Sequence, residues 1–71
     1  MKIHYYAETD SLYIEFNESP GVDSREIIDG VVVDLDANGG LVGIDVDHAS
    51  KKLDLAVLET ASLPLTKLRM A

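Results

Sequence analysis

The N-terminal part of the chain alternates between apolar and polar side chains with the two-residue period of a β-strand. Residues 2–6 and 11–16 both show this alternation and are rich in aromatic and β-branched residues. If the residues between them form a loop, one face is wholly apolar, and a slip by one residue would mix the two faces. The pattern therefore predicts a β-hairpin. Its expected pairs are Met1 with Phe16, Lys2 with Glu15, Ile3 with Ile14, His4 with Tyr13, Tyr5 with Leu12 and Tyr6 with Ser11.

A second region of alternating residues predicts another hairpin, with one apolar and one acidic face. Residues 31–36 and 41–47 flank the loop Ala37-Asn38-Gly39-Gly40, whose Asn and Gly residues tolerate positive φ. The expected apolar pairs are Leu35 with Val42, Val33 with Ile44 and Val31 with Val46. The opposite face is expected to carry Asp34, Asp36, Asp45 and Asp47, which we name the acidic ridge.

A further short strand is indicated immediately before Asp29-Gly30, between the two hairpins. A two-residue turn at Asp29-Gly30 places Ile28 beside Val31. The same turn also sets Glu26 opposite Val33, so a regular pairing does not separate apolar from polar side chains here.

After Asp47 the apolar residues fall at helical spacing, which predicts a helix over about residues 48–58 that packs on the apolar face of the sheet. Either Asp47 or Ser50 is a suitable N-cap residue. A strand is the alternative, because alternate residues from Leu53 to Val57 are also apolar.

These elements combine into one small α+β domain over residues 1–60. It consists of an antiparallel sheet of two β-hairpins, with about four to five strands, followed by the C-terminal helix. Residues 61–71 are apolar and basic, unlike the rest of the chain. We expect them to form a C-terminal tail that is ordered by a second copy or by a partner.

A chain of 71 residues suits one domain, and it buries only about 60% of the surface that its unfolded form exposes. Because it has no cysteine, neither disulfide bonds nor thiolate metal sites can support so small a core. We therefore expect self-association, as a homodimer. The sequence has no signal-peptide pattern and no run of about 20 apolar residues, so we expect a cytoplasmic protein without membrane contact.

Acidic side chains outnumber basic ones by 13 to 6, which gives a net charge of -7. Residues 7–47 hold eleven carboxylates and a single base, Arg25. This distribution argues against nucleic-acid binding, since phosphate contacts depend on clustered Lys and Arg. A basic protein partner fits an acidic surface better. The simpler interpretation is a surface that net charge keeps soluble.

The second hairpin also matches the first half of an EF-hand calcium loop, whose pattern places oxygen ligands at alternate positions and then a glycine. Asp34, Asp36, Asn38 and Gly39 occupy these positions. The twelfth position holds Asp45 instead of Glu, the ninth offers no side-chain oxygen, and strand-like residues flank the loop on both sides. These departures favour an ordinary hairpin turn.

Other metal sites and catalytic sites have weaker support. His48 follows Asp45 and Asp47, but a metal site needs three or four converging ligands, and His48 should leave the face that the aspartates share. The chain has no G-x-S-x-G elbow, no cysteine nucleophile and no glycine-rich phosphate loop. A sheet of this size also encloses little volume for a pocket. We expect no catalytic residues, no metal site and no cofactor.

Four segments resemble a known family in their order and spacing. They are Tyr5-x-x-Glu8-x-Asp10-x-Leu12-Tyr13-Ile14, Gly30-Val31-x-Val33-Asp34-x-Asp36, Leu41-Val42-Gly43-Ile44-Asp45-Val46 and Ala49-Ser50-Lys51. Over about residues 1–53 the chain is similar to the small prokaryotic proteins grouped as the domain of unknown function 2283. The resemblance implies a compact α+β domain of the bacterial or archaeal cytosol and supplies no catalytic residues. It also implies an antitoxin-like role beside small ribonuclease-like toxin proteins.

The hypothesis that these features favour is a non-enzymatic, dimeric interaction module. It would cover a basic protein partner with the acidic ridge or with the tail. One alternative is a cation-binding or small-molecule-sensing domain that uses the Asp34–Asp45 loop. Another is a purely structural homo-oligomer. The three hypotheses differ in what is bound: another protein, a small ligand, or a second copy of the chain.

Overall fold

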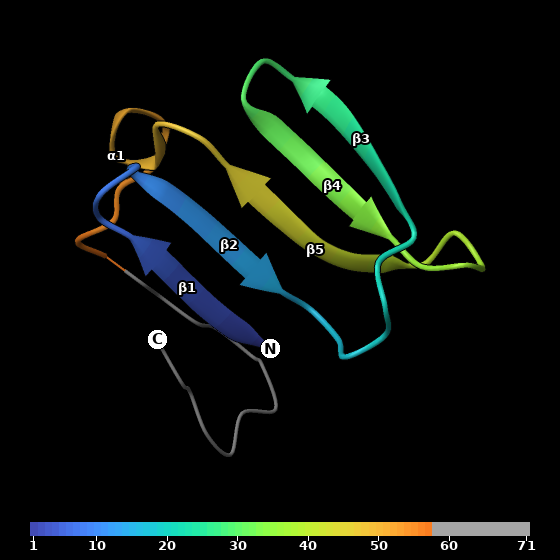
Figure 1. The fold of residues 1–71 in the computed structure, drawn as a ribbon. Coiled ribbons are helices and arrows are strands. Elements are labelled where there is room, and N and C mark those ends of the chain that lie inside the picture. The colour runs from blue at the N-terminus through green and yellow to red at the C-terminus, as the bar shows by residue number, and fades with distance from the viewer. Residues whose placement is uncertain (58–71) are drawn as a thin grey trace.

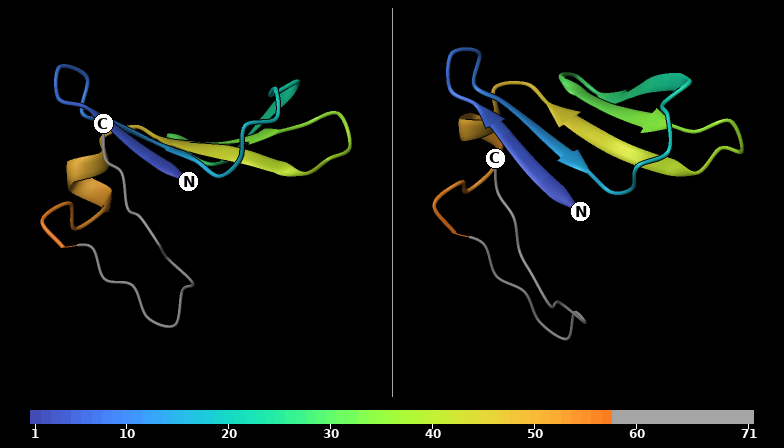
Figure 2. Two further views of the ribbon diagram at one scale, coloured as in Figure 1. Left: turned by 90° about the horizontal axis from the view of Figure 1, so that it is seen from below. Right: turned by 60° about the horizontal axis from the view of Figure 1, so that its bottom comes forward.

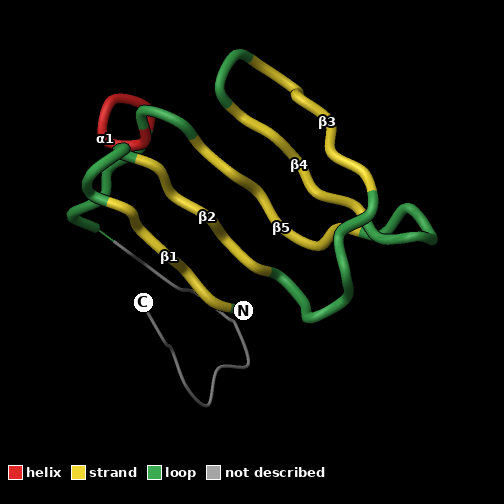
Figure 3. Tube along the Cα trace, in the orientation of Figure 1, coloured by secondary structure: helices red, strands yellow, loops and turns green. Residues whose placement is uncertain are grey.

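The structure, a computed structural model, describes residues 1–57 of the chain. These residues form a five-stranded antiparallel sheet in the order β1-β2-β5-β4-β3, followed by one short helix (Figure 1). The elements are β1 (Lys2–Tyr6), β2 (Ser11–Glu15), β3 (Asp23–Ile28), β4 (Val31–Leu35), β5 (Leu41–Val46) and α1 (Ala49–Lys52). Figure 3 shows the helix directly after β5, beside the loop that joins β1 to β2. The predicted α+β class, with an antiparallel sheet followed by a helix, is confirmed.

The first hairpin, β1 and β2, has the predicted register. Tyr5 pairs with Leu12 on one face. On the other face Lys2 pairs with Glu15, and the Lys2 ammonium nitrogen lies 3.9 Å from a Glu15 carboxylate oxygen. The separation of apolar from polar side chains was enough to select this register, because any odd shift would exchange the two faces.

The second hairpin, β4 and β5, differs from the prediction near its loop. Two of the predicted pairs are present, Val31 with Val46 and Val33 with Ile44. Leu35 pairs with Leu41 and not with Val42, because the register shifts after Asp34. The shift is a β-bulge, in which Leu41 and Val42 together oppose Leu35. The predicted pairing of Leu35 with Val42 is therefore wrong, since strict alternation leaves no place for an extra residue.

A second bulge explains how β3 pairs with β4. The predicted contact at the turn is present, with Ile28 paired to Val31. Glu26 pairs with Val32 and not with Val33, because Ile27 is an extra residue in β3. The expected pairing of Glu26 with Val33 is wrong for this reason. The bulge places the carboxylate of Glu26 on the polar side of the sheet, where water can reach it.

The predicted helix over residues 48–58 is too long, and no strand replaces it between Leu53 and Val57. α1 ends at Lys52, since Leu53 has an extended backbone with φ -127° and ψ 151°. Asp54 then begins a turn, and its carboxylate accepts a hydrogen bond from the amide of Ala56 at 3.2 Å. Such a local side-chain bond competes with the helical hydrogen bonds, which explains the early end of the helix.

The helix covers one end of the apolar face of the sheet (Figure 2). Ala49 of α1 is 0% exposed and packs against Leu12 of β2 and Val46 of β5, which are also buried. Because β2 and β5 are neighbours, the two hairpins share this core. No helix or strand of residues 1–57 covers the opposite face (Figure 2). The partly buried residues around the core are Ile3, Ile14, Val31 and Ile44.

Residues 58–71 lie outside the described part of the chain. The predicted domain boundary at residue 60 and the predicted tail over 61–71 therefore stay predictions. Among the described residues, no helix is long and apolar enough to cross a membrane.

Candidate protein-interaction face

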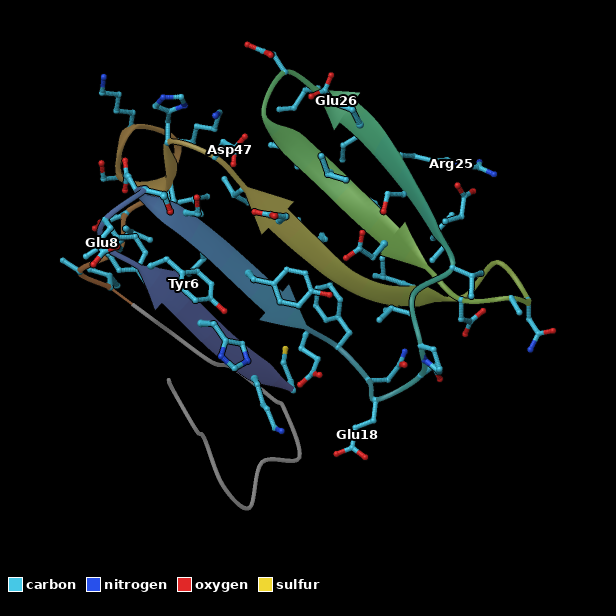
Figure 4. The ribbon with its side chains drawn as sticks, viewed as in Figure 1. Tyr6, Glu8, Glu18, Arg25, Glu26 and Asp47 are labelled. Carbon is cyan, nitrogen blue, oxygen red and sulfur yellow. The ribbon has the colours of Figure 1, made fainter. Side chains whose placement is uncertain are left out.

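The side chains that point away from α1 form what we call the polar face of the sheet. Strand pairing arranges them in rows across the sheet, because paired residues point to the same side. Figure 4 shows this face between Tyr6 on β1 and Glu26 on β3. One row is His4, Tyr13, Asp45, Val32 and Glu26, and the next is Lys2, Glu15, Gly43, Asp34 and Ser24.

Tyr13 of β2 reaches across β5 to a carboxylate of β4. Its hydroxyl donates a hydrogen bond to Oδ2 of Asp34 at 3.1 Å, and the Ser24 hydroxyl donates to Oδ1 at 2.7 Å. Gly43 leaves room for the tyrosine ring, because a Cβ atom there would lie 2.6 Å from Cζ of Tyr13 and 2.8 Å from the Ile14 carbonyl oxygen. One carboxylate thus links β2, β4 and β3 above the glycine of β5.

Asp45 is the second carboxylate of the polar face, and its neighbours across the strands are Tyr13 and Val32. Partial burial raises the pKa of Asp45, and the charges of Asp47 and Asp34 raise it further. Burial also raises the pKa of Tyr13, and the hydrogen bond from its hydroxyl to Asp34 raises it further. Burial is the main cause of both shifts, and the neighbouring carboxylates add to them, so a bound cationic group would favour the charged form of Asp45.

Only two of the four members of the acidic ridge lie within the strands that form the polar face. These are Asp34 and Asp45. Asp36 lies in the β4–β5 loop, where its Oδ1 accepts hydrogen bonds from the amides of Asn38 at 2.9 Å and Gly40 at 2.8 Å. Asp47 follows the end of β5 and is exposed (Figure 4). The prediction is wrong for Asp36, whose carboxylate is engaged by the loop, whereas the Asp47 amide still donates to the Gly30 carbonyl at 2.8 Å and its charge acts on Asp45.

The interpretation of the Asp34–Asp45 loop as a hairpin turn is confirmed, since β4 and β5 pair on both sides of it. The carboxylate of Asp36 is engaged by loop amides. Among residues 1–57, no three His, Asp or Glu side chains converge as metal ligands would. The cation-binding alternative has no geometric support in this part of the chain, and calorimetry with calcium, magnesium and zinc would test it.

A contact that the sequence analysis missed joins the first loop to the helix. The carboxylate of Asp10 accepts hydrogen bonds from the Ser50 hydroxyl at 2.7 Å, the Ser50 amide at 3.1 Å and the Tyr5 hydroxyl at 2.7 Å. The backbone carbonyl of Asp10 accepts another from the amide of Ala49 at 2.8 Å. Asp10 therefore caps α1 from a distant part of the sequence, in place of the predicted Asp47 or Ser50. We call Tyr5, Asp10 and Ser50 the Asp10 clamp.

The clamp changes the ionisation of its own groups. The hydrogen bonds from Ser50 and Tyr5 hold the pKa of Asp10 below its usual value, and nearby His48 lowers it further. The same bond to Asp10 raises the pKa of Tyr5. Because 40 positions separate Asp10 from Ser50, no periodicity in the sequence could pair them. Asp10 and Ser50 do both occur in the four sequence segments that resemble a known family.

A model of that family matches the chain over residues 2–50, and its description reads protein of unknown function (DUF2283). The match covers more than half of the 71 residues. The chain belongs to the DUF2283 family. Comparisons with curated proteins and with solved structures give no match. The predicted family is thereby confirmed.

The part that matches the DUF2283 model contains both features described above. It includes all five strands, and with them the polar face. It ends at Ser50, the residue through which the Asp10 clamp holds the helix. The DUF2283 description assigns no activity, so a function has to be argued from these side chains.

Proposed function

We propose that the polar face binds a positively charged segment of a protein partner, and that the protein is a non-enzymatic interaction module. The supporting observation is the hydrogen-bonded set of Tyr13, Asp34 and Ser24 on a face that no helix or strand of residues 1–57 covers. Side chains that are already held in place lose less conformational entropy when a partner binds.

The charge of this face favours a basic partner. Asp34 and Asp45 lie on adjacent strands, and Glu15 and Glu26 add carboxylates to the same two rows. A surface of one sign attracts segments of the opposite sign and speeds their association. The same potential repels nucleic acid, whose phosphates need basic side chains.

Aromatic rings on this face favour arginine over lysine. Tyr6 is 55% exposed on the edge strand β1, and Tyr13 lies on the adjacent strand β2 with its hydroxyl on Asp34. A guanidinium group can stack on an aromatic ring while it donates two hydrogen bonds to a carboxylate, which an ammonium group cannot do. The partner segment is therefore rich in arginine. A small basic toxin is one protein of this kind, which would make the role antitoxin-like.

The first test is a titration of the full chain with a short arginine-rich peptide, followed by NMR shifts of backbone amides. We expect the largest shifts in β2, β4 and β5. The double variant Asp34→Asn, Asp45→Asn should bind the peptide about tenfold more weakly, because exposed ion pairs contribute about 0.2–1 kcal/mol each. A lysine peptide of equal charge should bind more weakly than the arginine peptide.

The matched control is the double variant Glu8→Gln, Glu18→Gln, which changes the net charge by the same amount. Both residues lie in loops, away from the two rows of the polar face (Figure 4). The control should keep nearly all of the affinity. Equal losses in the two double variants would show that net charge alone attracts the peptide, and the proposal would then be wrong.

A further inference from the structure

The apolar face of the sheet holds two rows of side chains, and the described helix lies over only one of them. The first row contains Leu12 and Val46, which are buried beneath Ala49. The second row crosses four strands one repeat further from the helix, and its members are Ile3, Ile14, Ile44 and Val33. These four residues are only half-buried. Figure 2 shows α1 and the segment up to Val57 beneath one end of the sheet.

The two faces of the sheet differ sharply in charge. The polar face carries Asp34, Asp45 and Glu26, so two such faces would repel each other. The apolar face carries charge only along β3, where Arg25 and Asp23 lie opposite Val33 and Leu35. Arg25 Nε is 3.4 Å from Asp23 Oδ2, so these two charges compensate each other. In a chain of net charge -7, the apolar face is the face that two copies can bring together with less repulsion than the polar face.

We infer that a second copy of the chain covers the second apolar row, so that two sheets pack face to face around a two-fold axis. Such an interface uses the same residues from both copies and closes on itself. The face measures about 17 Å along the strands and about 20 Å across them, from standard strand dimensions. This is about 340 Å² per copy and roughly 700 Å² for the pair, less than the roughly 1,200–2,000 Å² that stable complexes bury, so the dimer is a weak one that should dissociate at about 100 µM.

Pairing through the edge strand β3 is a less suitable route to a dimer. β3 is an edge strand of the described sheet, and all of its residues are exposed. It carries Asp23, Arg25 and Glu26, and it is bulged at Ile27. Charged side chains and bulges are the features by which edge strands prevent the addition of another strand. The interface therefore lies on the face and not on this edge.

Sedimentation equilibrium of the full chain, from about 1 to 500 µM, tests the inference directly. We expect the mass to rise with concentration from 7.7 kDa toward twice that value. Val33→Lys places a charge in the second row and should leave only monomer at about 100 µM. Val32→Lys is the matched control, because the neighbouring residue on β4 points to the polar face. It should dimerise as the wild-type chain does.

Circular dichroism shows whether Val33→Lys still folds. If it does not, Val33→Thr provides the test, because threonine keeps the β-branched shape and adds one hydroxyl per copy to the interface. Its dissociation constant should rise about tenfold, and that of Val32→Thr should not change. A wild-type chain that stays monomeric at about 500 µM overturns the inference and points to residues 58–71 of the same chain as the cover. A dimer that all four variants leave intact overturns it as well.

Discussion

Asp10 receives hydrogen bonds from two elements that are far apart in the sequence. Its carboxylate accepts the Tyr5 hydroxyl of β1 and both donors of Ser50 in α1. A helix as short as α1 has few hydrogen bonds of its own, so its position depends on such contacts. Asp10 has a φ of 51°, a conformation that Asp and Asn tolerate better than most residues. The clamp therefore uses both the charge and the backbone preference of this residue.

Replacing Asp10 by asparagine should destabilise the protein at neutral pH. The clamp lowers the pKa of Asp10 in the folded state, so its stabilisation is present above the unfolded pKa of about 4 and is lost as the pH falls. Urea unfolding at several pH values should give curves for Asp10→Asn and wild type that differ most near pH 7 and converge in acid. Glu8→Gln, in the same loop, is the control and should track the wild type throughout. A difference that persists unchanged below pH 3 would contradict the role of the charge.

The hairpins show what a hydrophobic pattern does and does not predict for an element. It selected the register of β1 with β2, because the apolar face would otherwise be broken. It missed the bulges at Val42 and Ile27, since an extra residue interrupts the period of two that the prediction assumes. It also predicted too long a helix. The apolar residues keep their helical spacing after Lys52, but the local turn at Asp54 ends α1 there.

The bulge in β3 can be tested by a deletion. Ile27 is exposed, and every other residue of β3 keeps its partner in β4 if Ile27 is removed. We expect the deletion to change the free energy of unfolding by less than about 1 kcal/mol, as surface changes usually do. Deleting Val32 from β4 is the contrasting variant, because it exchanges the two faces for part of a central strand. That variant should not fold, as judged by circular dichroism. If the Ile27 deletion also fails to fold, the bulge has a further role.

At the scale of the whole molecule, the sequence predicted the sheet and the division into two faces, but only part of the candidate site. Asp34 and Asp45 were assigned to the polar face correctly because they lie within strands. The link from Tyr13 to Asp34 was not predicted, since it depends on β2 lying next to β5, a pairing between two separate hairpins. Local patterns carry no information about that pairing. The polar face exists as a continuous surface only because of it.

The concentration of carboxylates on the polar face should cost stability, as binding sites often do. Burial and the charges of Asp47 and Asp34 raise the pKa of Asp45 in the folded state. Its contribution to stability is therefore fully present below the unfolded pKa of about 4 and is lost as the pH rises through the folded value. Asparagine does not ionise, so the variant Asp45→Asn does not lose this stability as the pH rises. At pH 7 and low salt, its melting temperature should exceed that of the wild type by about 2–4 °C, which corresponds to about 0.5 kcal/mol.

Two conditions separate this electrostatic cause from a change in packing. At about 1 M salt the screening length falls to about 3 Å, so the part of the gain that comes from Asp47 and Asp34 should shrink. As the pH falls well below the unfolded pKa of about 4, the carboxyl becomes protonated in both the folded and the unfolded state, and the difference in melting temperature should vanish. Both measurements need equal protein concentrations, because self-association makes the melting temperature depend on concentration. A gain from Asp45→Asn that is the same in acid and at high salt would show that the polar face is not under electrostatic strain.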